Sequence, residues 1–449
     1  MSVWQKLWKK GDQQKDDQNK DVEVLDGEQP FNPFSELYFL QHHTDIVRHL
    51  LVIDERKCVS AGDDGFVVIW DIQLCMKLVV FEAHMRPVTC FLSFSSKNKD
   101  SDWLITGSSD KHIKVWDIDQ GKCVQDITEH GASVKCLLPV LDNMFLSAGE
   151  NLHLWSGDGT LLDTCLSDER DADITLLIST NIKNERFVTA CDKELTVYSI
   201  KSNSDMDKTG HKICRLKTLP PHLEAIGTLI QVSDKLFASG SLDGMILLWS
   251  SETFMPMKKL NTMSEYKGKS HIYPYSVQFI ACENQRYLLA AIGCGFAMFD
   301  TLYSKLLCKK LNAHYSKVTQ LTFVCDGLLL ATCSEDGSIR LWGQRSHSNP
   351  NEQLTVKASM GLSPIERFLD INFGQLHHNK GPDPFPEPAL VGECLGHCGS
   401  VMRIVDIGLE GMLSCGADNL VIAWKNSELQ KMKRNQVVQE KVLNPSGIV

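Results

Sequence analysis

The chain repeats one spacing of three residues five times: a Ser or Thr, an Asp four residues later, and a Trp six residues after the Asp. A His stands 17 to 22 residues before each Ser or Thr, with Val or Ile four residues after the His. So regular a pattern indicates an array of structural repeats, because one active site would need one such set. The five sets are His43, Ser60, Asp64 and Trp70; His84, Thr106, Asp110 and Trp116; His222, Ser239, Asp243 and Trp249; His314, Thr332, Asp336 and Trp342; and His397, Ser414, Asp418 and Trp424.

Three weaker copies fill the gaps between these sets. His130 precedes Trp155 with a turn shortened by two residues, and Asp192 precedes Tyr198. The third weak copy, AAIGCGFAMFD, closes with Phe299 and has neither the His nor the Asp. Counting the closing aromatic residues gives eight repeats. Short apolar runs between turn residues such as Asp-Gly are typical of β-strands.

A period of about 40 to 45 residues with a His before Trp-Asp resembles the WD-repeat signature of β-propellers. The resemblance predicts an all-β fold, an eight-bladed propeller in which each repeat supplies a four-stranded blade. One blade cannot cover both of its faces alone, but eight stacked around an axis cover each other and leave only narrow edges.

The resemblance also implies that the His, Ser or Thr, Asp and Trp of each set form a buried hydrogen-bonded network inside the blade. A buried carboxylate needs donors, and imidazole, hydroxyl and indole groups supply them. The same residue types could form a Ser-His-Asp hydrolase. Five equivalent sets and the lack of a nucleophile-elbow motif argue against a hydrolase, so we expect no catalytic residues and no enzyme.

The ends of the chain predict how the ring closes. The last repeat stops at Trp424 without an outer strand, whereas ELYFL, residues 36–40, lies ahead of the first repeat as a surplus strand. We therefore expect the N-terminal strand to complete the last blade. The expected parts are a mostly disordered tail (1–35), the propeller (36–425) with a long insertion in its seventh blade (343–388), and a C-terminal helix and tail (426–449).

Composition excludes several classes of function. With 46 basic and 56 acidic residues the chain has a net charge of -10, which argues against a nucleic-acid backbone as the main partner. Sixteen scattered cysteines without a signal peptide indicate reduced thiols and a cytoplasmic protein. No apolar run is long enough to span a membrane.

Motifs for bound groups are weak. The stretch CLGHC, residues 394–398, has neither the haem spacing nor enough ligands for zinc, and its His already belongs to a repeat set. No glycine-rich phosphate-binding motif occurs. We therefore expect no metal and no cofactor.

Three segments outside the repeats carry apolar residues. The N-terminal MSVWQKLWKK is either a disordered tail or a helix that docks on a membrane or a partner. The insertion in the seventh blade either folds back on the propeller or presents a linear docking motif. After the last Trp, Ser427 and Gln430 fit a capping box, so a helix is expected that either packs beneath the propeller or holds a partner.

Over nearly its whole length the chain resembles one subfamily of WD-repeat proteins, most closely in NPFSEL, HTDIVRHLL, SAGDDGFVVIW, CSEDGSIRLW and GADNLVIAWKN. Members of this subfamily are non-catalytic propeller subunits of a complex with two DENN-domain proteins in autophagy and lysosomal nutrient signalling. The resemblance implies that the N-terminal strand and the C-terminal helix hold a DENN-domain partner, through Glu36, Leu37, Tyr38, Phe39, Leu429, Met432, Val437 and Val438.

The resemblance further implies that the insertion engages a lysosomal transporter of cationic amino acids and recruits the cytoplasmic complex to the lysosomal membrane surface. The alternative is a stand-alone propeller that reads peptide motifs, which would need an aromatic cage or a basic cluster at the mouth of the channel. The residues of the insertion predicted to act in recruitment are Ile365, Phe368, Leu369, Ile371 and Phe373.

Overall fold

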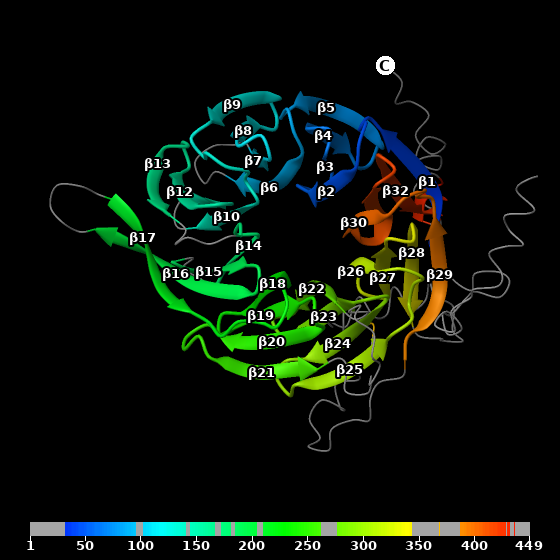
Figure 1. The fold of residues 1–449 in the computed structure, drawn as a ribbon. Helices are drawn as coiled ribbons and strands as arrows, with labels where there is room; N and C mark the ends of the chain where they lie inside the picture. Colours follow the sequence, from blue (N-terminus) through cyan, green and yellow to red (C-terminus); the bar gives the residue numbers. More distant parts are fainter. Residues whose placement is uncertain are drawn as a thin grey trace, which may run out of the picture.

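The strands of the protein form a closed ring of eight antiparallel four-stranded sheets, as the computed structural model shows (Figure 1). This confirms the predicted eight-bladed propeller. No helix among the described residues is long and apolar enough to cross a membrane. The structure describes residues 32–95, 102–140, 144–166, 172–180, 185–203, 210–261, 276–343, 368, 387–427, 429–431 and 435.

The first four blades follow each other along the chain, and each runs from an inner strand to an outer one. Their strands are β2 (Val47–Val52), β3 (Lys57–Gly62), β4 (Phe66–Asp71) and β5 (Met76–Glu82); β6 (Val88–Ser95), β7 (Asp102–Ser108), β8 (Ile113–Asp117) and β9 (Lys122–Ile127); β10 (Cys136–Val140), β11 (Met144–Ala148), β12 (Leu152–Ser156) and β13 (Leu161–Cys165); and β14 (Leu176–Ser179), β15 (Arg186–Cys191), β16 (Glu194–Asn203) and β17 (Gly210–Thr218).

The next three blades repeat this order, and the last blade takes its outer strand from the other end of the chain. Their strands are β18 (Ile226–Ser233), β19 (Leu236–Ser241), β20 (Met245–Ser250) and β21 (Pro256–Asn261); β22 (Val277–Glu283), β23 (Tyr287–Ile292), β24 (Gly295–Asp300) and β25 (Lys305–Lys310); β26 (Val318–Val324), β27 (Leu329–Ser334), β28 (Ser338–Gly343) and β29 (Ala389–Leu395); and β30 (Val401–Asp406), β31 (Gly411–Gly416), β32 (Leu420–Asn426) and β1 (Phe34–Gln41), with the 3-10 helix η2 (Gly408–Glu410) before β31.

The Asp-Gly turns of the repeats join the second and third strands of the blades. Gly65 and Gly337 hold these turns in the left-handed region, with φ of 77° and 82°. Only glycine adopts that conformation without a steric penalty, which explains why the letter recurs. The repeated Asp beside each glycine is thereby placed at the same end of its blade.

The N-terminal strand closes the ring, as predicted. Strand β1 pairs antiparallel with β32, with Leu37 opposite Trp424 and Leu40 opposite Val421. It begins at Phe34, and both Phe34 and Leu40 are buried. The two ends of the propeller therefore share one sheet.

The hydrophobic core lies between neighbouring blades. Each cluster of buried side chains joins two adjacent blades and contains one of the eight closing aromatic residues. Trp70, for example, packs with Leu413 of the last blade, and Trp424 packs with Leu341 of the seventh. Since every blade is covered by its neighbours, the stability of each depends on the closure of the ring.

A short helical segment follows β32, as predicted, with helical residues at 427, 429–431 and 435. Its cap differs from the expected Ser427. The Asn426 side chain accepts the hydrogen bond from the backbone N–H of Leu429, at 3.2 Å. Ser427 is already helical, and its backbone N–H donates to the carbonyl of Pro33. The helix therefore starts directly at the end of β32.

Candidate functional site

The repeated polar residues form hydrogen-bonded chains inside the blades. In the first blade the Trp70 indole N–H donates to Ser60 Oγ at 2.8 Å, and His43 Nε2 lies 2.8 Å from the same hydroxyl. His43 Nδ1 lies 2.9 Å from Asp64 Oδ2. Each group has one consistent role if Ser60 donates to Nε2 and Nδ1–H donates to the carboxylate. The same connections occur in three further blades, through His84 and Asp110, His314 and Asp336, and His397 and Asp418.

The carboxylate of Asp336 has the fullest set of donors. It accepts from the backbone N–H of Tyr315 and Ser338, from the Ser338 hydroxyl and from His314. Burial by itself raises the pKa of Asp336, but these hydrogen bonds outweigh it and hold that pKa below its usual value. Burial lowers the pKa of His314. The result is an ionised Asp beside a neutral, buried His.

The fifth blade breaks the pattern at its Asp. His222 Nε2 and the Trp249 indole both contact Ser239 Oγ, at 2.7 and 2.8 Å. Asp243 accepts from the backbone N–H of Met245, but its Oδ2 is buried without a partner among the described residues. Matching letters in the sequence therefore correspond to two different hydrogen-bonding environments.

This difference predicts different costs for the same substitution. Asp336→Ala should lower the free energy of unfolding by about 1 to 3 kcal/mol, because His314 and Ser338 lose their acceptor. Asp243→Ala should cost less, since one backbone donor loses its partner and a poorly satisfied oxygen disappears. Urea denaturation of the two variants measures the difference. Full stability of Asp336→Ala combined with loss of a single partner would instead identify Asp336 as a contact residue.

The third blade lacks the turn Asp, and a second histidine from its third strand lies beside the first. The rings of His130 and His153 lie 4.7 Å apart, and the Nε2 atoms of both are buried without partners in the described part of the chain. Burial, and secondarily His130, lowers the pKa of His153 to about 4. Burial lowers the pKa of His130 as well, so both rings favour the uncharged form at neutral pH. Among the described residues no group of three or more His, Cys, Asp or Glu side chains could hold a metal ion.

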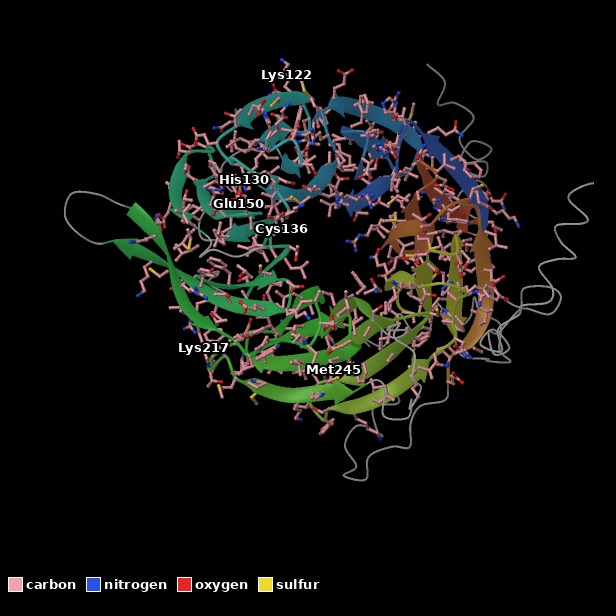
Figure 2. All side chains as sticks on the ribbon, viewed as in Figure 1. Lys122, His130, Cys136, Glu150, Lys217 and Met245 are labelled. Atoms are coloured by element: carbon pink, nitrogen blue, oxygen red, sulfur yellow. The ribbon has the colours of Figure 1, made fainter. Side chains whose placement is uncertain are left out.

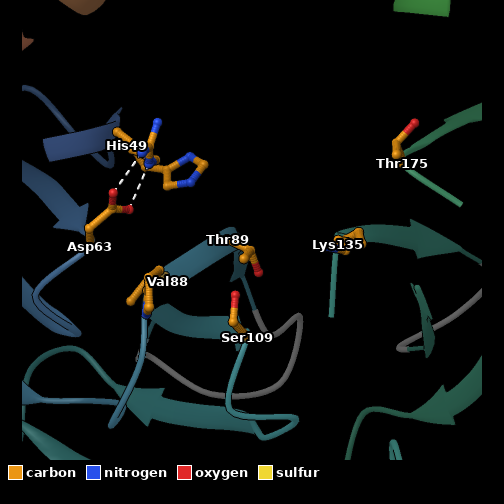
Figure 3. A pocket seen from close by; sticks show the side chains of 9 residues that line it. His49, Asp63, Val88, Thr89, Ser109, Lys135 and Thr175 are labelled. Carbon is orange, nitrogen blue, oxygen red and sulfur yellow. Dashed lines mark hydrogen bonds and ion pairs between the residues drawn. The ribbon is translucent and has the colours of Figure 1, made fainter. Parts of the chain in front are cut away.

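A cavity of about 400 Å³ lies where the inner ends of the first four blades meet (Figure 3). Two cations line it, and each faces a carboxylate. Arg48 forms two hydrogen bonds of 2.6 Å with Asp63, and Lys135 Nζ lies 3.5 Å from Asp173. Burial first, and the nearby Arg403 second, lower the pKa of His49 in the same wall to about 4. With its charges balanced, the cavity does not favour an anionic peptide.

The outer edge of the last blade exposes the residues predicted for partner binding. Leu37, Tyr38 and Phe39 are 38%, 39% and 51% exposed on β1, and Glu36 accepts a hydrogen bond from the Tyr38 hydroxyl at 3.2 Å. We call these four residues the β1 edge. In the described sheet, β1 is an outermost strand and pairs only with β32. An exposed apolar strand edge of this kind is a frequent site of protein association.

The β1 edge lies next to the start of the C-terminal helix. The backbone N–H of Ser427 donates to the Pro33 carbonyl at 3.2 Å, immediately before β1. Leu429 is half-buried. Met432, Val437 and Val438 lie outside the described residues. Two segments at opposite ends of the sequence, both predicted to contact the same partner, thus begin side by side.

The seventh-blade insertion leaves and re-enters the propeller at one point, because Gly343 at the end of β28 pairs with Ala389 at the start of β29. Within it, Phe368 is only 3% exposed and its ring lies 5.5 Å from that of Phe323. It belongs to the cluster around Trp342. The burial of Phe368 therefore agrees with the alternative in which the insertion folds back on the propeller. The other predicted recruitment residues, Ile365, Leu369, Ile371 and Phe373, lie outside the described part of the chain.

Sequence reasoning missed two buried cations that join neighbouring blades or strands. Lys425 Nζ donates to the Ile72 carbonyl at 2.8 Å, which links the last blade to the first. Arg340 donates to the Ala313 carbonyl and pairs with Glu393 at 2.8 Å. A lysine or arginine in a strand is ordinarily read as surface, and no spacing in the sequence marks these two as buried.

Comparisons with known proteins agree with this architecture. The β-propeller family described as WDR41 matches residues 5–434. WD repeat-containing protein 41 from human is 29% identical over 441 residues, covering 92% of this chain and 92% of that protein. The DENN domain and WD repeat-containing protein SCD1 from Arabidopsis thaliana is 22% identical over 220 residues, covering 48% of this chain and 14% of that protein.

Among solved structures, the computationally designed Ika8 protein superimposes with a TM-score of 0.60 at 18% identity. The match covers 86% of this chain and 98% of that chain. At this identity the likeness concerns the fold alone. The propeller framework of this chain is therefore shared with proteins of different sequence, and function must be argued from its edges and insertions.

Proposed function

Because the chain belongs to the WDR41 family of β-propellers, whose fold is a scaffold for protein interactions, we propose that it is a non-catalytic adaptor that binds two DENN-domain proteins and recruits their complex to lysosomes. In this proposal the propeller of residues 36–425 is the rigid frame. The flanking segments 1–35 and 426–449 and the insertion 343–388 supply the contacts. The protein acts in the cytoplasm, in autophagy and nutrient signalling.

One observation carries the proposal: the β1 edge and the start of the C-terminal helix adjoin each other on the last blade. The Pro33–Ser427 hydrogen bond holds the start of β1 against the start of the helix. The β1 edge follows on the same strand, from Glu36 opposite Lys425 to the half-exposed Phe39 opposite Ile422. A partner that covers both segments would bury aromatic side chains and could add a strand to β1. The Arabidopsis thaliana relative supports DENN-domain partners, since its name places a DENN domain and WD repeats in one protein.

Recruitment is assigned in this proposal to a lysosomal transporter of cationic amino acids, bound by the seventh-blade insertion. Its contact residues are Ile365, Leu369, Ile371 and Phe373. Phe368 is given a different role, because its burial against Phe323 fits an anchor that fastens the insertion to the blade. An anchor at Phe368 divides the insertion into two shorter spans between fixed points, which reduces the entropy lost on binding.

The test replaces exposed aromatic residues of the β1 edge. The double variant Tyr38→Ser with Phe39→Ser should reduce capture of a co-expressed DENN-domain partner by more than about tenfold, as expected for central aromatic contacts. The melting temperature should stay within a few degrees of wild type, since both side chains are exposed. A matched control, Val124→Ser with Leu161→Ser, changes exposed apolar residues on β9 and β13 and should bind normally.

Capture of the partner at wild-type strength by the Tyr38 and Phe39 variant would refute the assignment of the site. The stand-alone reader gives a different result in the same pull-down. If the chain is a stand-alone reader, even the wild-type chain would recover no DENN-domain protein. Peptide binding would instead be lost on substitution of Lys135, which lines the cavity at the inner ends of the first four blades.

A further inference from the structure

The outer strands of the ring differ sharply in charge. Strands β17, β21 and β25, on three consecutive blades, contain three, two and three Lys or Arg residues and no Asp or Glu. The other five outer strands, β1, β5, β9, β13 and β29, contain two Lys and five acidic residues. In a chain whose net charge is -10, this is a strong local reversal of sign.

The most accessible part of this region lies on β17 and β21, which adjoin each other. The Lys217 ammonium on β17 contacts the Phe254 carbonyl at 3.2 Å and Met255 Sδ at 3.4 Å, immediately before β21. Figure 2 shows Lys217 on the outer circumference of the ring. On β25, by contrast, Lys310 pairs with Glu387. We define the basic rim by its five cations, Lys212, Arg215, Lys217, Lys258 and Lys259.

Exposed apolar side chains are interspersed with these cations. Met255 and Met257 are 53% and 58% exposed, and Leu216 on the neighbouring strand is 45% exposed. Lys258 and Lys259 continue the exposed run on β21, and among the described residues neither forms an ion pair. The surface thus combines positive charge with flexible apolar groups.

We propose that the basic rim docks the propeller on the surface of a membrane containing anionic lipids. Lysines attract anionic headgroups, and flexible apolar side chains between them can enter the interface. The five outer strands of the other blades carry five acidic residues against two lysines and would be repelled, so the molecule would approach the membrane with this rim first. The observations are independent of the partner sites proposed above.

Two alternative roles for the basic rim agree less well with its residues. An acidic protein partner is disfavoured because four of the five cations are lysines, which protein interfaces use sparingly. Protection of exposed strand edges from aggregation could use charges of either sign. Among the five outer strands of the other blades, β5 and β9 carry both signs and β1, β13 and β29 carry acidic residues alone, whereas β17 and β21 carry only cations beside the exposed Met255 and Met257.

The experiment measures co-sedimentation of the full chain with vesicles of phosphatidylcholine, with and without about 30 mol% phosphatidylserine. We expect binding to the anionic vesicles only, falling as NaCl rises from about 50 to about 300 mM. The variant Lys258→Glu with Lys259→Glu should bind more than about tenfold more weakly. The milder variant Lys258→Gln with Lys259→Gln should bind vesicles with an affinity between those of wild type and of the double Glu variant. The melting temperature of each variant shows whether it is folded.

The matched control is Lys77→Glu with Lys122→Glu, which makes the same charge change on β5 and β9. It should bind like wild type. Equal losses in both variants, equal binding to neutral vesicles, or no binding at low salt would each overturn the proposal. Capture by polyglutamate beads without vesicle binding would also overturn it, in favour of an acidic protein partner. Capture of DENN-domain proteins should be unaffected in all variants, so this test and that of the β1 edge can fail separately.

Discussion

Deletion of residues 34–41 is expected to open the ring and to lower the melting temperature by more than any single substitution at the surface. The deletion removes the whole of β1 and leaves β32 as an unpaired edge. It also removes Phe34 and Leu40 from the core, and losses of this kind cost roughly 2 to 5 kcal/mol for each large apolar side chain. That sum is comparable to the total stability of many domains.

Thermal unfolding followed by circular dichroism measures the effect, and the Tyr38→Ser with Phe39→Ser variant is its control. The control removes exposed side chains from the same strand and keeps its backbone pairing, so its melting temperature should remain near that of wild type. A deletion variant with the same melting temperature as the wild-type protein would show that the last blade is stable with three strands.

The second large effect is expected for Phe368→Ala. Its side chain is buried among residues of the sixth and seventh blades, including Phe323 and Trp342. Replacing a buried phenylalanine by alanine leaves a cavity and costs about 3 to 5 kcal/mol. Urea denaturation should therefore show a large loss of stability, although Phe368 lies in the middle of an insertion between two strands of the seventh blade. Phe39→Ala, at a half-exposed site, is the matched control and should change stability little.

A second comparison separates anchoring from recruitment. The double variant Leu369→Ser with Phe373→Ser keeps the Phe368 anchor and should fold with wild-type stability, while recruitment to lysosomes in starved cells should be lost. If Phe368→Ala is fully stable and loses only recruitment, then Phe368 itself contacts the partner. If Leu369→Ser with Phe373→Ser unfolds, the insertion covers the propeller more widely.

The sequence determined the number and identity of the blades. The spacing of His, Ser or Thr, Asp and Trp is local, because all four lie within one repeat and their contacts follow from the strand order of a single blade. The closure of the ring was also predictable, since one surplus strand at the start matched one missing strand at the end. Weak copies were recognisable from the repeat residues that they retain, as with Trp155, whose indole N–H donates to Ser147.

Only the tertiary structure decided the contacts between residues that are not part of the repeated pattern. It left Asp243 without the His222 bond, capped the last helix with Asn426, and buried Phe368 and Lys425. It also placed Ser427 beside Pro33, and β17 beside β21 on the outer rim. Side-chain exposure and neighbourhood across blades depend on how whole sheets stack, and residues far apart in the sequence carry no local signal of that stacking.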